Sequence, residues 1–355
     1  MSTDFGTFAG GEGFPFATGR GACHDVRMKG SDISQARAWA CAFLIAGVVG
    51  GPSNRAAEGP LPQDPLSGSR YELTADRWWL LNLPDGQRVD ASGLVRFPNG
   101  DWWVVNDQRN SIYQLEFPKE GAASTNSVDL LRVPGLFEPM PLKALGIGEH
   151  ARLDCEGLAL DGSGRVYLCE EARRWILRWD PSTKALSRLP IQWGAVAKYF
   201  HPTDFNASFE GIAVSGDRLY VANERQEGRI IVVDVKSLAV VDDFMVAPSD
   251  SVGRDHNYSD LCWSDGSLWV LMRDVRKVLR VDVRTKSVIA EFDYGAMETA
   301  RPVAYGALVA PGFMEGLVVD EEWLWLLSDN NGVGRRANLK DIRPTLFRCR
   351  RPDRQ

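Results

Sequence analysis

A glutamate-glycine pair recurs along this sequence, each time at the start of a short segment of β-type residues. The clearest copies are Glu156-Gly157, Glu210-Gly211 and Glu315-Gly316. Each copy is followed by a polar turn and an aromatic-aliphatic segment, which ends in acidic or amide side chains at 170–171, 223–224 and 329–330. Repetition of one such unit indicates a repeat fold, in which every unit is one supersecondary element.

Two weaker copies extend the pattern. In one, Asp260 replaces the glutamate and Leu261 the glycine; in the other, Ser92 precedes Gly93. The five copies follow one another at intervals of about 50 to 64 residues. Each interval leaves room for two more short segments that are β-branched, aromatic and bounded by turn residues, as strands are.

Four antiparallel strands repeated radially form a β-propeller. We therefore predict an all-β fold, a single β-propeller of five four-stranded blades within residues 70–352. Six blades are the alternative, because the segments 118–150 and 190–208 are long enough to contain irregular elements. The last repeat lacks an outer strand, and the apolar segment 78–83 is available to supply it. Such closure would leave no unpaired edge between the first and last blades.

The first 60 residues do not resemble a folded domain. They contain an apolar run at 38–49, which is too short to span a bilayer and is typical of a signal-peptide core. We therefore expect a disordered leader with a signal peptide at about 28–55, and a periplasmic or secreted protein. The net charge of −6 argues against nucleic-acid binding and favours cations as ligands. We expect a monomer without an integral membrane domain.

Four cysteines lie outside this leader, at 155, 169, 262 and 349, and we expect buried thiols. The sequence has no CxxC pair and no His/Cys spacing typical of zinc sites. A hairpin centred on 162–163 would place Cys155 opposite Glu170 and Glu156 opposite Cys169. The two cysteines would then lie on opposite faces of the sheet and would not form a disulfide.

The repeat also predicts where polar groups gather. The start of an innermost strand and the end of its antiparallel neighbour lie at one rim, so the blades together bring these residues to one mouth of the central channel. Carboxylates crowded there would raise one another's pKa unless a cation intervenes. Carboxylate and amide oxygens suit a hard divalent cation, most simply Ca²⁺. The predicted metal ligands are Glu156, Glu210, Asp260, Glu315 and Asn223.

The remaining candidate residues come from the same rim. Arginines could pair with the acids blade by blade, in which case the ring would be structural. The candidate catalytic residues are His256, Glu224 and Asp274, and the candidate substrate-binding residues are Arg225, Arg273 and Arg109. The sequence has no G-x-S-x-G nucleophile elbow.

Three hairpins carry a resemblance to a known family. Segments 154–157 with 169–171, 209–213 with 222–225, and 314–317 with 327–330 resemble the phytase-like β-propeller proteins ("esterase-like activity of phytase"), over roughly residues 70 to 350. More distantly, the same hairpin pattern is similar to gluconolactonase-like propellers, in which a Glu/Asn/Asp set on the axis holds a divalent metal. The chain departs from the repeat at Ser92 and Asp260, which breaks the symmetry of the ring.

The resemblance implies an exported hydrolase of ester or phosphoester bonds. Under this hypothesis a divalent cation and the rim residues act on a small anionic or ester substrate. The alternative is a non-catalytic propeller that binds a ligand or a protein at the same mouth, with a structural divalent cation. A propeller by itself does not imply an enzyme.

Overall fold

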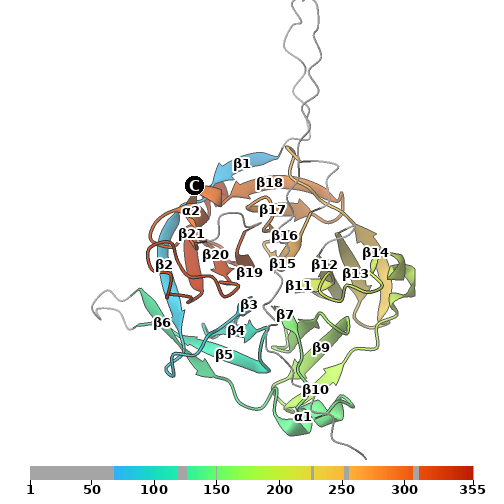
Figure 1. Ribbon diagram of the computed structural model, residues 1–355. Helices are drawn as coiled ribbons and strands as arrows, with labels where there is room; N and C mark the ends of the chain where they lie inside the picture. The colour runs from blue at the N-terminus through green and yellow to red at the C-terminus, as the bar shows by residue number, and fades with distance from the viewer. Residues whose placement is uncertain are drawn as a thin grey trace, which may run out of the picture. The chain divides into compact units, whose positions relative to one another are not determined.

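Short strands surround the centre of the fold (Figure 1). The computed structural model describes residues 68–118, 126–148, 150–224, 228–251, 256–306 and 312–354. Neighbouring central strands contact one another in a closed ring, in chain order. They are β3 (Ala91–Arg96), β7 (Cys155–Leu160), β11 (Phe209–Ser215), β15 (Tyr258–Ser264) and β19 (Met314–Val319).

Each central strand is followed by strands that lie progressively farther from the centre. The second strands are β4 (Trp102–Asn106), β8 (Val166–Glu170), β12 (Arg218–Asn223), β16 (Ser267–Met272) and β20 (Trp323–Ser328). The third are β5 (Ser111–Glu116), β9 (Trp175–Asp180), β13 (Arg229–Asp234), β17 (Lys277–Asp282) and β21 (Thr345–Arg350). The strands that follow the first four of these are β6 (Ser127–Arg132), β10 (Ala185–Arg188), β14 (Ala239–Phe244) and β18 (Ser287–Asp293).

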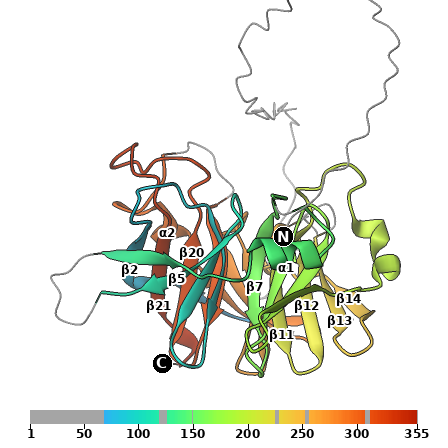
Figure 2. The same cartoon turned by 90° about the horizontal axis from the view of Figure 1, so that it is seen from below.

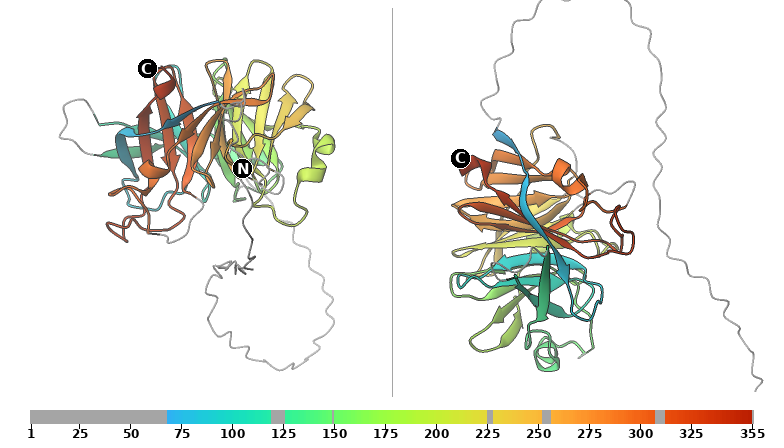
Figure 3. Two further views of the ribbon diagram at one scale, coloured as in Figure 1. Left: turned by 90° about the horizontal axis from the view of Figure 1, so that it is seen from above. Right: turned by 90° about the vertical axis from the view of Figure 1, so that its left-hand side faces the viewer.

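Two strands near the start of the described chain pair with sheets formed near its end. Strand β2 (Ala75–Asn82) runs antiparallel to β21, with Trp78 opposite Phe347. It also pairs in parallel with β6 over three residues, so that two groups of four strands join into one eight-stranded sheet. Strand β1 (Ser69–Glu72) pairs in parallel with β18. Figure 3 shows both strands, in blue, on the outer side of the orange and red sheets.

The arrangement is all-β and propeller-like, as predicted. The described helices are short: α1 (Pro139–Ala144) and α2 (Gly295–Thr299), with 3-10 turns at 193–195, 197–199 and 352–354. Within the described residues, no helix has the length and apolarity needed to cross a membrane. The predicted leader and signal peptide lie outside the described residues.

The hydrophobic core is divided among the interfaces between adjacent sheets. Figure 2 shows β7, β11 and β12 side by side, and the interior residues of β7–β9 pack against those of β11–β13 in one such cluster. At another interface, the indole of Trp325 from β20 lies against Trp79 from β2 and Trp102 from β4, with ring centroids 5.8 Å and 4.6 Å away. The tryptophans thus hold neighbouring sheets together. Cys155, Cys169 and Cys349 are buried, Cys262 is half-buried, and all four are free thiols, as expected.

Every central strand has a register shift at the repeated pair or, in β15, directly before it. In β7, Cys155 lies opposite Glu170 as predicted, but the register then shifts and Leu158 lies opposite Leu168. Equivalent shifts occur in β3, β11, β15 and β19. A bulge places two residues opposite one and redirects a side chain. The predicted pairing of Cys155 with Glu170 is therefore correct, but the regular register predicted beyond it, with Glu156 opposite Cys169, is not.

The repeated glycines allow the central strands to approach each other closely. A β-carbon on Gly157 would lie 2.5 Å from the carbonyl oxygen of Glu210 in the next central strand. Gly93 and Gly211 meet the backbones of Glu156 and Asp260 in the same way, at 2.4 Å and 2.5 Å. In the repeated glutamate-glycine pair, the register shift thus redirects the side chain of the acid, and the glycine lets the backbone of the next central strand approach closely.

We expect Gly157→Ala to destabilise the fold, because its new methyl group would meet backbone rather than a movable side chain. Overpacking of this kind costs about 1–3 kcal/mol of the free energy of unfolding. Urea unfolding measures the change. Gly162→Ala is the matched control, because a β-carbon there would meet nothing within 4 Å. Equal stability of the two variants would contradict this role for the glycine.

Candidate functional site

Buried acidic side chains gather at the rim where the central strands begin. Glu156, Glu210 and Glu315 come from the starts of β7, β11 and β19, and Glu171 and Glu224 directly follow β8 and β12. All five are less than 9 % exposed. The antiparallel pairing within each sheet brings strand starts and strand ends to this same rim, as the sequence predicted.

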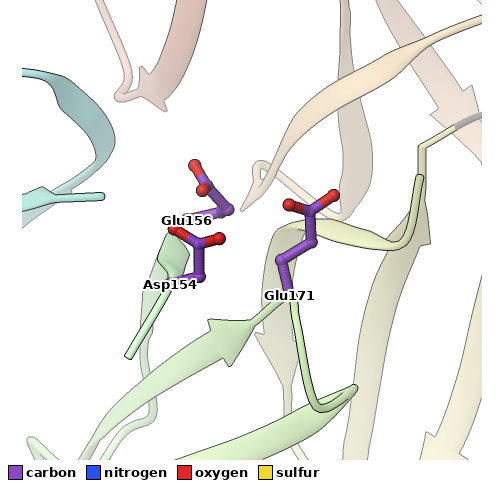
Figure 4. Close-up of side chains that lie close together, drawn as sticks. All are labelled: Asp154, Glu156 and Glu171. Carbon is purple, nitrogen blue, oxygen red and sulfur yellow. The ribbon is translucent and has the colours of Figure 1, made fainter. Parts of the chain in front are cut away.

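The geometry brings together two overlapping groups of carboxylates. Asp154, Glu156 and Glu171 have carboxylate oxygens within 4.8 Å of one another, and so do Glu171, Glu210 and Glu224. Figure 4 shows the side chains of the first group, with Asp154 and Glu156 at the start of β7 and Glu171 after β8. Glu171 belongs to both groups and is therefore at the centre of the cluster.

The cluster is electrostatically strained. Burial raises the pKa of Glu210 well above its usual value, and the charges of Glu224, Glu156 and Glu171 raise it further. Burial, and then the charge of Asp107, raise the pKa of Glu156, although its hydrogen bond from Ser92 opposes the change. Like charges at such distances stay ionised together only when a cation balances them.

Arg273 supplies positive charge on one side of the cluster. It follows β16, is mostly buried, and donates hydrogen bonds to Glu224 Oε1 and Glu315 Oε1. It therefore links three sheets. The other oxygen of Glu315, Oε2, is buried without a hydrogen-bond partner among the described residues. Arg273, predicted to bind substrate, here serves the acids of the protein itself.

Two residues break the glutamate pattern, and each has a distinct role. Asp260 accepts backbone hydrogen bonds from Leu261 and Leu317, both at 2.8 Å, and so braces two central strands. Ser92 donates to Glu156 Oε2 at 2.5 Å. A serine here thus orients the neighbouring acid, while the predicted ligand Asp260 has both oxygens engaged by backbone.

His256 is buried, and both of its ring nitrogens have partners. Nδ1 lies 3.0 Å from Asp274 Oδ2, and Nε2 lies 3.0 Å from the carbonyl oxygen of Ser251. Two of the three predicted catalytic residues therefore contact each other. Asp274 Oδ1 is buried without a partner in the part of the chain that the structure describes. This geometry fits a positioning role for His256 better than direct contact with a substrate.

The other predicted residues lie in different settings. Asn223 is fully buried at the end of β12. Arg109 is on the surface and donates to Gln87 Oε1. Arg225 lies outside the described residues.

Sequence reasoning named Glu171 as a rim acid without choosing it as a ligand, and it overlooked Asp154. A signal for Asp154 was present, because residues two apart on a strand point to the same face. Asp154 and Glu156 have this spacing. The bulge at Glu156 and Gly157 weakens that rule locally, so only coordinates could place both carboxylates beside Glu171.

The residues present fit a hard divalent cation. The two groups offer only carboxylate oxygens, which Ca²⁺ and Mg²⁺ prefer. Arg273 pairs with Glu224 and Glu315, and Arg152 lies 3.2 Å from Asp154. The raised pKa values of Glu156 and Glu210 show that negative charge remains costly within the cluster, which gives a physical reason for a cation to bind. By contrast, the imidazole and thiolate ligands that zinc and copper favour are absent from both groups.

We expect the metal-free protein to lose stability as pH rises from about 4 to about 8. Burial raises the pKa of Asp329 from 3.8 to about 8, and that of Glu315 to about 7 despite the opposing charge of Arg273. Both groups therefore bind protons in the folded chain at pH values where the unfolded chain has lost them, so the stabilisation is lost as pH rises. Urea unfolding of chelator-treated protein measures this. The decline should be smaller in Asp329→Asn, and stability that increases over this interval would contradict it.

A family model for phytase-like proteins, described as "esterase-like activity of phytase", matches residues 86–332. The chain belongs to this family. The matched segment includes every strand that contributes a carboxylate to the two groups. A comparison with curated proteins found no match.

A solved structure supports the fold of this phytase-like protein. The glutaminyl cyclase of Myxococcus xanthus is similar with a TM-score of 0.53 and 15 % identity, over 80 % of this chain and 98 % of that one. The PQQ-bound aldose sugar dehydrogenase of Streptomyces coelicolor has a TM-score of 0.42 and 13 % identity, over 81 % and 99 % of the two chains. At these identities the likeness concerns the fold alone.

Proposed function

We propose that this phytase-like protein is an exported, metal-dependent hydrolase of ester or phosphoester bonds. The observation that carries the proposal is the pair of buried carboxylate groups that share Glu171. In the proposed site Glu156, Glu171 and Glu210 hold a divalent cation, most simply Ca²⁺, with Asp154 and Glu224 at its edges. Such a cation, when bound, polarises the carbonyl or phosphoryl oxygen of an ester.

The surrounding residues have separate tasks in this proposal. Ser92 orients Glu156, and Arg273 balances part of the negative charge of Glu224 and Glu315. Asp107 is the best-suited proton acceptor, because its pKa is raised by burial to about 6 and its Oδ1 has no partner among the described residues. A base with a pKa near the working pH transfers protons efficiently.

We also propose that the fold has five blades and closes through β2. Support comes from the closed ring of five central strands and from the antiparallel pairing of β2 with β21. The sheet order adds support, since the eight-stranded sheet divides naturally into β19-β20-β21-β2 and β6-β5-β4-β3.

A screen of chromogenic carboxylic esters and phosphate monoesters tests the activity. The purified protein is assayed as isolated, after chelation, and after Ca²⁺ or Mg²⁺ is returned. The proposal predicts hydrolysis that disappears on chelation and recovers with one of the ions. Activity that survives complete metal removal would contradict it.

One observation favours a second candidate, a non-catalytic binding propeller with a structural cation. Asp260 and Glu315 make contacts that would brace neighbouring sheets, and His256 pairs with Asp274 at the rim of a single sheet. For this candidate, metal binding would raise the melting temperature, and no ester in the screen would be hydrolysed.

A further inference from the structure

A separate cavity lies beside the connection from β2 to β3. Its volume is about 370 Å³, and it is bounded on one side by residues 81–83 and 86–89 and on the other by 338 and 340–344. Its polar lining includes Gln87, Arg88, Asn338, Lys340 and Arg343. These residues come from two connecting segments rather than from the carboxylate cluster, so the cavity is distinct from the proposed metal site.

The cavity is rich in cationic groups. Arg88, Lys340 and Arg343 line it, with Asp341 as the opposing acid. Arg343 donates to Asp341 from both Nε and Nη2, at 2.8 Å and 2.9 Å, and Asp341 also lies 3.5 Å from Arg335. Arg88 is paired with Asp90 through both Nε, at 2.5 Å, and Nη2. Lys340 is exposed and has no ion-pair partner among the described residues.

Several contacts connect this cavity to the acidic rim. The segment that lines it leads directly into β3, and Asn330 Nδ2 donates to the carbonyl oxygen of Val89 at 2.9 Å. Arg109, which follows β4 at the rim, donates to Gln87 Oε1. The adjoining central strand is the one where Ser92 stands in place of a glutamate. The basic cavity thus borders the acid ring where one acid is missing.

This juxtaposition has a direct electrostatic consequence. A ring of carboxylates repels an anionic substrate, and fixed cations beside the ring attract one. Arginine and lysine recognise oxyanions through charge-assisted hydrogen bonds, and the planar arginine group can bind two oxygens at once. An anionic group held in the cavity would leave the rest of its molecule free to extend toward the rim.

We propose that this cavity is an oxyanion-binding site, which holds a phosphate or carboxylate group of the substrate through Arg88, Lys340 and Arg343. The substrate class is then an ester that carries a negatively charged group away from the bond that is cleaved. The claim that the bound anion is part of a hydrolysed substrate rests on the proposed hydrolase function. Anion binding by the cavity does not depend on that function.

Calorimetric titration of the full chain with inorganic phosphate tests the binding. Metal is first removed with chelator, and the chelator, itself an anion, is dialysed away. We expect saturable binding that weakens with added salt. Arg88→Gln with Lys340→Gln should weaken it at least about tenfold, because each lost charge-assisted contact is worth about one order of magnitude. If the double variant does not fold, the single variant Lys340→Gln is titrated in its place. It removes one surface charge that has no ion-pair partner among the described residues, and it should also weaken phosphate binding.

Lys184→Gln is the matched control. Lys184 is also exposed, but it lies in the turn between β9 and β10, away from the cavity. Its phosphate affinity should equal that of the unmodified chain. No saturable phosphate binding, or equal affinity in the cavity variants and in Lys184→Gln, would overturn the proposal.

Failure of the hydrolase function remains distinguishable from failure of this inference. Glu210→Gln should retain phosphate binding even where metal binding and hydrolysis are lost. In an active enzyme, Lys340→Gln should raise KM for an anionic ester and leave KM for a neutral ester unchanged. An equal change for both esters would contradict an oxyanion site that contacts the substrate.

Discussion

Glu210→Gln is expected to abolish most metal binding and hydrolysis together. The change retains the size of the side chain and removes one of the negative charges grouped with Glu171 and Glu224. Loss of a carboxylate ligand should lower the metal affinity by at least about 10- to 100-fold, which is the loss seen when residues that only support a ligand are changed. Calorimetric titration with Ca²⁺ and the rate of ester hydrolysis measure the two effects.

The same variant should become more stable in the absence of metal. Burial and three neighbouring acids raise the pKa of Glu210, so its charge costs free energy in the folded state. Its removal should raise the melting temperature of chelated protein and abolish the further rise that Ca²⁺ produces. Asp282→Asn, at the end of β17, is the control for Ca²⁺ affinity, because Asp282 belongs to neither carboxylate group and the variant should bind Ca²⁺ like the unmodified chain. Unchanged Ca²⁺ affinity in Glu210→Gln would rule out its role as a ligand.

Arg273→Met is expected to cause the largest loss of stability. Arg273 is the partner of Glu224 and Glu315, and both acids are buried. Removal of one partner from a buried ion pair costs about 3–5 kcal/mol, because it leaves charge uncompensated. Urea unfolding measures the loss.

Neutralisation of the two acids provides a specific rescue. In the Arg273→Met background, Glu224→Gln with Glu315→Gln should restore much of the stability, since no uncompensated charge then remains. Arg284→Met removes an exposed partner of Asp282 and should leave stability unchanged. If Arg273→Met were as stable as Arg284→Met, the ion pairs of Arg273 with Glu224 and Glu315 would not contribute to stability.

The repeat made much of the fold predictable. An acid and a glycine recur at the start of each innermost strand. Short strands with alternating side chains, separated by turn residues and repeated in this way, favour a β-propeller over most other folds. The expected pairing of 78–83 near the last strand corresponds to β2 beside β21, because an unpaired edge and an unassigned apolar segment were both visible in the sequence.

The site was less predictable, because it depends on bulges and on side-chain partners. Periodicity placed Glu156, Glu210 and Glu315 at one rim, but equal positions in a repeat do not imply equal partners. Arg273 engages Glu315, and backbone amides engage Asp260. These hydrogen bonds join different sheets, and the bonded residues lie 42 and 57 residues apart in the chain. No local sequence pattern predicts such pairings.

The central claim is that the acids around Glu171 hold a divalent cation on which hydrolysis depends. The most direct measurement is the rate of hydrolysis of a responsive ester as Ca²⁺ is titrated into chelated protein, alongside the same titration of Glu171→Gln. The proposal predicts that activity returns with saturable binding of the ion in the unmodified chain and does not return in the variant. Equal activity in both proteins, or activity that is independent of the ion, would contradict it.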